Sequence, residues 1–195
     1  MKANQGFVVA LAASLVLFLA WTQVPARAAG ADAIEQEKSE LRDMVRETLK
    51  RLYKIQPAAR EAISKSAGYA VFSNFGMKSF FAGGGSGKGV VYDQKKKTEI
   101  FMKMVEIQAG LGLGAKKFKL VWVFEHHKDV GEFIHSGWEF GGQVSMAAKL
   151  GDEGGAFAGA MSVSPGIWLY QLTDDGLALE FTGKGTKYYQ DEDLN

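Results

Sequence analysis

Apolar residues between Ala33 and Ile55 recur at steps of three and four, which predicts a helix with one apolar face. The positions on that face are Ile34, Leu41, Val45, Thr48, Leu52 and Ile55. Pro57 ends this helix, because proline lacks the N–H that a helix interior needs, and it suits the start of a second short helix over 57–66. Gly68 ends the second helix. Such a segment is too small to bury its own apolar face, so we expect it to pack on a sheet.

Beyond Gly68 the pattern changes to short apolar runs separated by glycine, which predicts strands. The chain has 24 glycines, and 22 of them lie between Gly68 and Gly185. The expected strands cover 69–72, 87–92, 98–106, 107–115, 118–125, 138–150, 156–163, 167–173, 177–182 and 186–190. We also expect a hairpin around 93–97, a short helix over 127–135 and a tight turn at 174–176. The sequence therefore predicts an α+β fold, with N-terminal helices packed on a glycine-rich, curved, mainly antiparallel and barrel-like sheet.

The segment 107–115 alternates strictly between apolar residues and small or polar ones. Gly110, Gly112 and Gly114 then point to one side of a strand and leave that side without side chains. Something large must cover such a face, since protein interiors contain few voids. Aromatic side chains of the protein itself are the favoured cover, and a ligand is the alternative.

The first 28 residues have the three parts of a secretory signal peptide. Lys2 gives a positive start, 7–21 is an apolar run interrupted only by Ser14, and Ala26-Arg27-Ala28 provides small residues in an A-x-A arrangement. A membrane-spanning helix needs about 20 apolar residues, which is longer than this run. We therefore expect cleavage after Ala28 and an exported, soluble product over 29–195, with cleavage at 29–31 as the second option.

Composition narrows the possible functions. The 195 residues contain 23 Lys and Arg against 22 Asp and Glu, so no bulk charge drives nucleic-acid binding. Lys2 and Arg27 leave with the signal peptide, which takes the formal charge from +1 to −1. The absence of cysteine excludes disulfides, thiol nucleophiles and Cys-ligated metals. The fold must therefore be held by its core alone.

No catalytic or cofactor motif in the sequence is complete. The glycine-rich run 83–89 lacks the first glycine and the Ser or Thr of a phosphate loop, and it precedes a strand, so a closely packed β segment is favoured. Ser86 has lysine where a nucleophile elbow needs its last glycine. A metal site could only combine Glu125, His127, Asp129 and His135, and adjacent histidines such as His126 and His127 face opposite ways on a strand. We therefore predict a protein that is not an enzyme and that carries no cofactor and no metal.

Two lysine clusters are the candidate binding residues. They consist of Lys95, Lys96 and Lys97, and of Lys116, Lys117 and Lys119, all expected at or near strand ends. Contact with lipid phosphates is one interpretation, and Phe118 between the lysines resembles the pattern of a membrane-contacting loop. Turn solubility and protection of sheet edges is the other. Both interpretations stay open.

The first helix carries a basic row beside its apolar face, formed by Lys38, Arg42, Arg46, Lys50 and Lys54. Such a row suits a helix that lies on an anionic membrane. However, Glu40, Asp43 and Glu47 lie on the same helix, so we favour a solvated helix docked on the sheet, with i,i+4 pairs such as Glu47–Arg51. The acidic tail 191–193 is expected to be solvated.

Several glycine and aromatic spacings resemble the SYLF domain family. The matching segments are 67–72 with 83–91, the run 110–114 before 120–124, and Tyr170 with 176–177 and 188–189. The resemblance covers Ile34–Asn195 and implies a single domain that binds phosphoinositides and membranes, as eukaryotic members do; some of those also bind actin. This chain lacks the usual proline within 73–75 and has lysines in 93–98 where the family has a tryptophan-containing stretch. Phosphoinositide specificity and actin binding are therefore not expected.

The sequence thus leads to two functional hypotheses. The leading one is non-enzymatic binding of a phospholipid or membrane surface in the bacterial periplasm. The alternative is a periplasmic protein-interaction module in maintenance of the cell envelope. A lipid binder floats with anionic liposomes, whereas an interaction module retains a protein partner.

Overall fold

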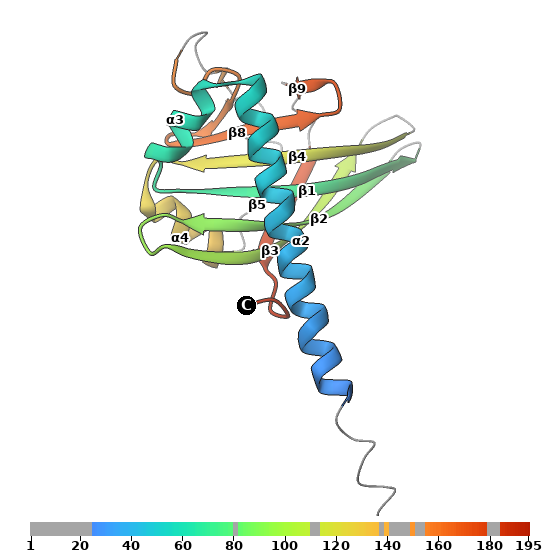
Figure 1. Ribbon diagram of the computed structural model, residues 1–195. Helices are drawn as coiled ribbons and strands as arrows, with labels where there is room; N and C mark the ends of the chain where they lie inside the picture. The colour runs from blue at the N-terminus through green and yellow to red at the C-terminus, as the bar shows by residue number, and fades with distance from the viewer. Residues whose placement is uncertain are drawn as a thin grey trace, which may run out of the picture. The chain divides into compact units, whose positions relative to one another are not determined.

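The computed structural model describes residues 25–79, 82–109, 114–136, 139–140, 149–150, 155–178 and 184–195. The chain divides into two compact units, Met1–Glu37 and Lys38–Asn195. In the first unit the described residues are helical and belong to α2 (Pro25–Ile55). Every other helix and strand among the described residues lies in the second unit (Figure 1).

Two N-terminal helices were expected, and both are present. Helix α2 ends at Ile55 as predicted, but it begins at Pro25 rather than at Ala33. Helix α3 (Ala58–Lys65) follows with Pro57 as its N-cap residue. Among the described residues no helix is both long and apolar enough to cross a bilayer.

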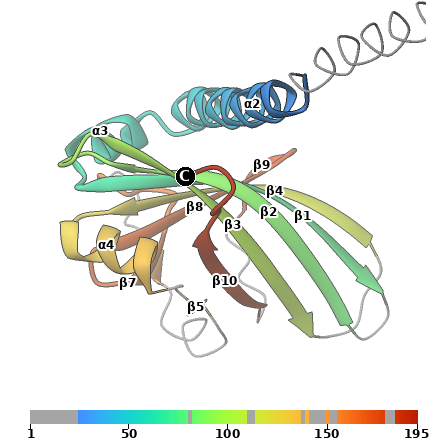
Figure 2. The ribbon, with the colours of Figure 1, turned by 90° about the horizontal axis from the view of Figure 1, so that it is seen from below.

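The described strands form one ten-stranded antiparallel sheet. Its four long strands are β1 (Gly68–Ser79), β2 (Ala82–Asp93), β3 (Thr98–Ala109) and β4 (Gly114–Phe124). The others are β5 (Glu139–Phe140), β6 (Lys149–Leu150), β7 (Met161–Ser164), β8 (Ile167–Thr173), β9 (Gly176–Ala178) and β10 (Lys184–Gln190). The order is β5-β10-β3-β2-β1-β4-β8-β7-β6, with β9 paired to β8. The sheet curls into a half-barrel, so the predicted α+β class with a curved antiparallel sheet is confirmed (Figure 2).

Three predicted strands need correction. The segment 107–115 is not a strand of its own, because 107–109 end β3 and 114–115 begin β4, while 110–113 lie outside the described residues. Alternation has a period of two residues in one long strand and in two consecutive strands alike, so it does not show where β3 ends and β4 begins. Within 138–150 the described strands are only the short β5 and β6, and the strand predicted over 156–163 begins at Met161.

One face of the sheet, here called the outer face, carries Val71, Val90, Phe101 and Val121. Leu41, Val45 and Leu52 of α2 and Ile63 of α3 pack on these residues. Arg42 strengthens the contact, since its Nε donates to Glu99 Oε1 at 2.8 Å and its guanidinium lies over the Phe101 ring. Residues 38–55 therefore form a helix docked on a sheet, as favoured from the sequence (Figure 2).

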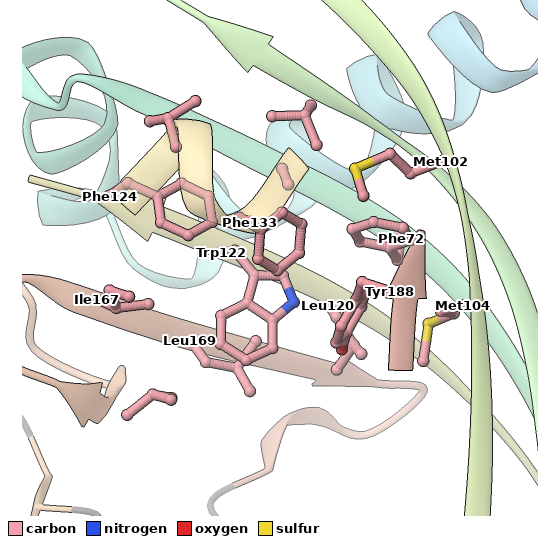
Figure 3. Close-up of a cluster of buried hydrophobic side chains, with 14 of the residues drawn as sticks. Phe72, Met102, Met104, Leu120, Trp122, Phe124, Phe133, Ile167, Leu169 and Tyr188 are labelled. Carbon is pink, nitrogen blue, oxygen red and sulfur yellow. The ribbon is translucent and has the colours of Figure 1, made fainter. Parts of the chain in front are cut away.

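The opposite, inner face holds a cluster of aromatic rings. Phe72 lies on β1, Trp122 and Phe124 lie on β4, and Tyr188 lies on β10. The ring of Phe133, on helix α4 (His127–His135), lies 5.0 Å from that of Phe124 and 5.0 Å from that of Tyr188 (Figure 3). Strand β4 adds Phe118, Leu120, Trp122 and Phe124 to this cluster, all from one face of the strand.

The glycine-rich run 83–89 is part of β2, as the rejection of a phosphate loop required. A Cβ at Gly89 would lie 2.5 and 2.6 Å from ring carbons of Phe72, and a Cβ at Gly87 would lie 2.2 Å from the Ser73 carbonyl oxygen. Glycine is thus needed where β1 and Phe72 approach β2 most closely. Here an aromatic side chain of the protein covers the bare face. Gly110 and Gly112 lie outside the described residues.

Candidate functional site

The lysines 95–97 lie in the turn between β2 and β3 and are exposed. Asp93 organises this turn, since its Oδ1 accepts the backbone N–H of Lys95 at 3.1 Å and that of Lys96 at 2.9 Å. The Lys96 ammonium lies 3.7 Å from Asp93 Oδ2. Lys97 has φ 56°, a left-handed conformation that closes the turn. This cluster is therefore a structured hairpin turn in which one lysine already faces a carboxylate.

Asp93 is also bonded to a histidine, His127 at the start of α4, whose Nε2 lies 2.9 Å from Asp93 Oδ2. Burial disfavours the Asp93 carboxylate, but hydrogen bonds from the Lys96 backbone and from His127 outweigh this and lower the pKa of Asp93. Among the described residues no three His, Asp or Glu side chains gather as a metal ion would need. His127 thus supports the turn.

The second cluster lies on β4, at the opposite end of the strands. Lys116 pairs with Gly76 of β1, Lys117 with Phe75 and Lys119 with Ser73. Strand β4 pairs with β8 only from Lys119 onward, so among the described strands 114–118 has a partner on one side only. Lysine on such an edge hinders pairing with another chain. Edge protection is therefore one role that the structure gives Lys117.

The two clusters are far apart. The turn 94–97 lies beyond the end of β1 at Gly68, whereas Lys116 stands opposite Gly76, eight residues along the same strand. At ~3.3 Å per residue this separates them by roughly 26 Å. The structure does not bring the six predicted lysines into one site. Phe118 lies on β4 with its side chain buried on the inner face, so it does not belong to an exposed loop beside the lysines.

Two lysines that were not predicted stand in line with Lys119. Lys119 pairs with Ser73, Ser73 with Lys88 and Lys88 with Lys103, which places their side chains on the outer face of four adjacent strands. We call these four residues the lysine row. The predicted hairpin around 93–97 contained the signal, because its register sets Lys88 opposite Lys103. A lysine inside a strand has no neighbouring lysines in sequence, so no local cluster marks it as a binding residue.

At one end of the lysine row, a buried carboxylate neutralises the cations. Asp191 Oδ1 lies 2.8 Å from Lys103 Nζ, and Asp191 Oδ2 lies 3.3 Å from Lys88 Nζ. Asp193 Oδ2 adds a contact of 3.1 Å to Lys103. Burial opposes ionisation of Asp191, yet the ammonium groups of Lys103 and Lys88 lower its pKa. The expectation of a solvated acidic tail is wrong for Asp191, because the chain turns back after β10 onto these lysines.

At the other end, Lys119 has a different environment. Its Nζ donates to Ser73 Oγ at 2.8 Å, and among the described residues no carboxylate pairs with it. Burial, followed by the charge of nearby Lys117, lowers the pKa of Lys119. A half-buried ammonium has three N–H donors, and a single hydroxyl satisfies only one of them. This end of the row is therefore the part of the described surface best suited to receive an anion.

The inner face at this level is polar as well. Asn74 Nδ2 donates to Glu106 Oε2 at 2.8 Å, and both side chains are buried. Asn74 Oδ1 has no hydrogen-bond partner among the described residues. The pair lies beside the aromatic cluster, where burial raises the pKa of Tyr188.

Comparison with known proteins gives one informative similarity. The chain is 31% identical over 144 residues to Beta cell expansion factor A from Aeromonas veronii. The alignment covers 74% of this chain and 53% of that protein, so the chain spans about half the length of the relative it matches. No family model matches the chain.

Proposed function

We propose that this chain is a SYLF-type protein that binds anionic lipid surfaces and catalyses no reaction. The glycine and aromatic spacings, the curved antiparallel sheet and the similarity to Beta cell expansion factor A support the family assignment. That relative's name refers to an effect on beta cells and names no ligand. Lipid binding therefore rests on the residues of this chain.

The observation that carries the proposal is the environment of Lys119. A half-buried ammonium is costly, because removal from water disfavours the charged form. Ser73 supplies one hydrogen bond, and Lys117 adds a second positive charge nearby. A phosphate oxygen that accepts from Lys119 would supply the missing counter-charge. The exposed lysines 95–97 are the second candidate site, at the other end of the strands.

Electrostatics limits the expected strength of binding. Each Lys or Arg near an anionic membrane contributes about 1 kcal/mol, so three engaged lysines give only weak affinity, on the order of millimolar. Salt screens charges beyond about 8 Å at physiological ionic strength. The binding should therefore weaken steeply as salt is raised.

Co-sedimentation with anionic vesicles at increasing salt tests the proposal. We expect the parent to bind and a variant with all six predicted lysines changed to Gln to lose binding without loss of fold, since lysines in turns and near strand ends contribute little to stability. Two triple variants, Lys95/Lys96/Lys97→Gln and Lys116/Lys117/Lys119→Gln, remove equal charge from opposite ends of the sheet. We expect the second to be more damaging.

A parent protein that ignores anionic vesicles but retains an envelope protein in pull-downs would favour the interaction-module hypothesis. A sixfold variant that binds as well as the parent would show that these lysines serve solubility alone. Circular dichroism of each variant excludes unfolding as the cause of a loss.

We further propose export with cleavage near Ala28, on the grounds of the apolar run 7–21 and the A-x-A site. The intact mass of protein from a periplasmic extract checks this, and we expect a chain that begins at residue 29. Protein that retains Met1 and fractionates with membranes contradicts it.

A further inference from the structure

Beyond α2, the outer face of the sheet continues over the far ends of five strands. Figure 1 shows α2 crossing β4, β1, β2 and β3, whose glycine-rich ends extend past the helix. Figure 2 shows those ends curving away from it. The lysine row marks the boundary of the area that α2 covers. On one side of the row, Val71, Val90 and Phe101 pack under the helix, whereas Val105 on the other side does not.

Register identifies the side chains on this part of the sheet. Lys103 pairs with Tyr189, and Val105 pairs with both Ser86 and Lys187, so all of them share the outer face. We call this surface the basic outer face, and its members are Lys88, Lys103, Lys117, Lys119, Lys187, Val105 and Tyr189. Five of these seven residues are lysines.

The charge on this surface is strongly one-sided. None of the described outer-face positions of β10, β3, β2, β1 and β4 beyond α2 carries an acid. Asp191 and Asp193 reach the surface from the C-terminal turn and meet Lys103, and Glu139 of β5 stands opposite Lys187 in the register. The lysines Lys117 and Lys119 lie at the other margin, across the sheet from these acids.

Two apolar side chains accompany the lysines. Val105 is 39% exposed and Tyr189 is 36% exposed, and these two belong to the few large apolar residues with such exposure in the described chain. Tyrosine suits the boundary between headgroups and hydrocarbon, because its ring is apolar and its hydroxyl polar. Lysines around a tyrosine and a valine therefore match an anionic lipid surface better than they match a small soluble anion.

We propose that the basic outer face is the surface that docks on an anionic bilayer. This rests on the proposed lipid-binding function and names the part of the molecule that performs it. Five adjacent strands at ~4.8 Å spacing are about 19 Å wide, which is enough to contact several headgroups at once. The surface includes three lysines that sequence reasoning did not select, and it excludes the turn 94–97.

Matched charge variants test the location. Lys117/Lys119/Lys187→Gln removes three charges from the basic outer face, and Lys50/Lys54/Lys65→Gln removes three from the helices. We expect the first to weaken vesicle binding at least tenfold and to reduce its salt dependence, because each lysine near the membrane contributes about fivefold. The second should bind like the parent. Equal losses, or a loss only in the helix variant, would overturn the proposal.

Labelling gives an independent readout that needs no loss of binding. The chain has no cysteine, so Val105→Cys and Lys65→Cys each carry one environment-sensitive dye. With vesicles of phosphatidylglycerol, emission from position 105 should shift to the blue while that from position 65 stays unchanged. A parent that binds these vesicles without any shift at 105 contradicts the location alone. A parent that binds no vesicles contradicts the proposed function itself, and capture of an acidic protein at 105 would assign the surface to a protein partner.

Discussion

The same four strands run through two regions of opposite character. Between α2 and α4 their side chains are apolar and buried on both faces, with Val71, Val121 and Phe101 outward and Phe72 and Trp122 inward. A few residues further along, the outer face changes to lysine and the inner face to the pair Asn74–Glu106. Alternation continues without interruption; only the residue types change.

The contrast assigns stability to the apolar region of the sheet and the proposed binding to the lysine-bearing region. Burial of apolar area stabilises the first region by about 25 cal/mol per Å², whereas the second region gains little from its exposed lysines. The lysine row lies between the two regions. Its Lys103 end is neutralised by Asp191, and its Lys119 end is not neutralised by any described residue. We therefore expect substitutions in the two regions to have different consequences.

The largest difference should come from the inner aromatic cluster. Phe133 is 1% exposed, and its ring contacts those of Phe72, Trp122, Phe124 and Tyr188. Phe133→Ala should lower the free energy of unfolding by about 3–5 kcal/mol, through lost burial and the cavity left behind. Lys117→Ala, in the other region, should change it by less than about 0.5 kcal/mol. Urea denaturation followed by circular dichroism measures both, and equal effects would remove the contrast.

A second difference concerns glycines in the two regions. A Cβ at Gly89 would meet the Phe72 ring at 2.5 Å, whereas a Cβ at Gly185 of β10 would meet nothing within 4 Å. We expect Gly89→Ala to destabilise the fold by about 1–3 kcal/mol, because overpacking forces neighbouring groups apart. Gly185→Ala should leave the midpoint of thermal unfolding almost unchanged. If both variants melt like the parent, the close approach of β1 to β2 is not a constraint.

Local patterns predicted much of the first region. Helix α4 and strand β8 have the predicted bounds, 127–135 and 167–173, because each is bordered by clear turn residues and has one period throughout. The predicted apolar face of α2 is confirmed at Leu41, Val45 and Leu52 for the same reason. Elements with one strong period can be located without knowledge of their partners.

Contacts between residues distant in sequence were harder to predict. Asp191 pairs with Lys88 and Lys103, roughly a hundred residues earlier, so nothing near the tail indicated a buried carboxylate. Arg51 was expected to pair with Glu47, yet it donates to the carbonyl oxygens of Thr173 and Asp174 at the turn after β8. Glu47 lies instead 3.9 Å from Lys50. Local spacing offers candidate partners, and the fold selects among them.

Removal of the Asp191 charge should lower the stability of the fold and change its pH dependence. Asp191→Asn should cost about 1–2 kcal/mol of stability, less than for a fully buried pair because both lysines can be rehydrated. The pKa of Asp191 is lowered in the folded state, so its carboxylate stabilises the fold above the unfolded pKa of about 3.9, and this contribution is lost as pH falls through the folded pKa. The variant should therefore lose less stability than the parent on acidification.

The same variant should bind anionic vesicles more tightly. Without the carboxylate, Asp191 no longer compensates the positive charges of Lys88 and Lys103. The basic outer face then has one more net positive charge, which is worth roughly fivefold in affinity. Asp193→Asn serves as the control, since its carboxylate is mostly exposed and screened. Unchanged binding by Asp191→Asn, with the fold intact, would show that these two lysines take no part in binding.

The smallest effect on stability is expected at the other end of the row, in Lys119→Met. Burial lowers the pKa of Lys119, so between its folded pKa and the unfolded value of about 10.4 the folded state binds fewer protons than the unfolded one. The parent should therefore gain stability as pH rises through this window, and at neutral pH the charged side chain should lower the stability slightly.

Methionine keeps the length and removes the charge, so the Lys119→Met variant should be equal to the parent in stability or more stable by up to about 0.5 kcal/mol. It should lack the alkaline gain, while its affinity for anionic vesicles falls about fivefold. Lys117→Met should weaken binding too, but it should remove only part of the alkaline gain, because burial is a larger cause of the lowered Lys119 pKa than the charge of Lys117. A clear loss of stability in Lys119→Met would mean that the bond to Ser73 holds β4 to β1, and that the unneutralised end of the row is structural.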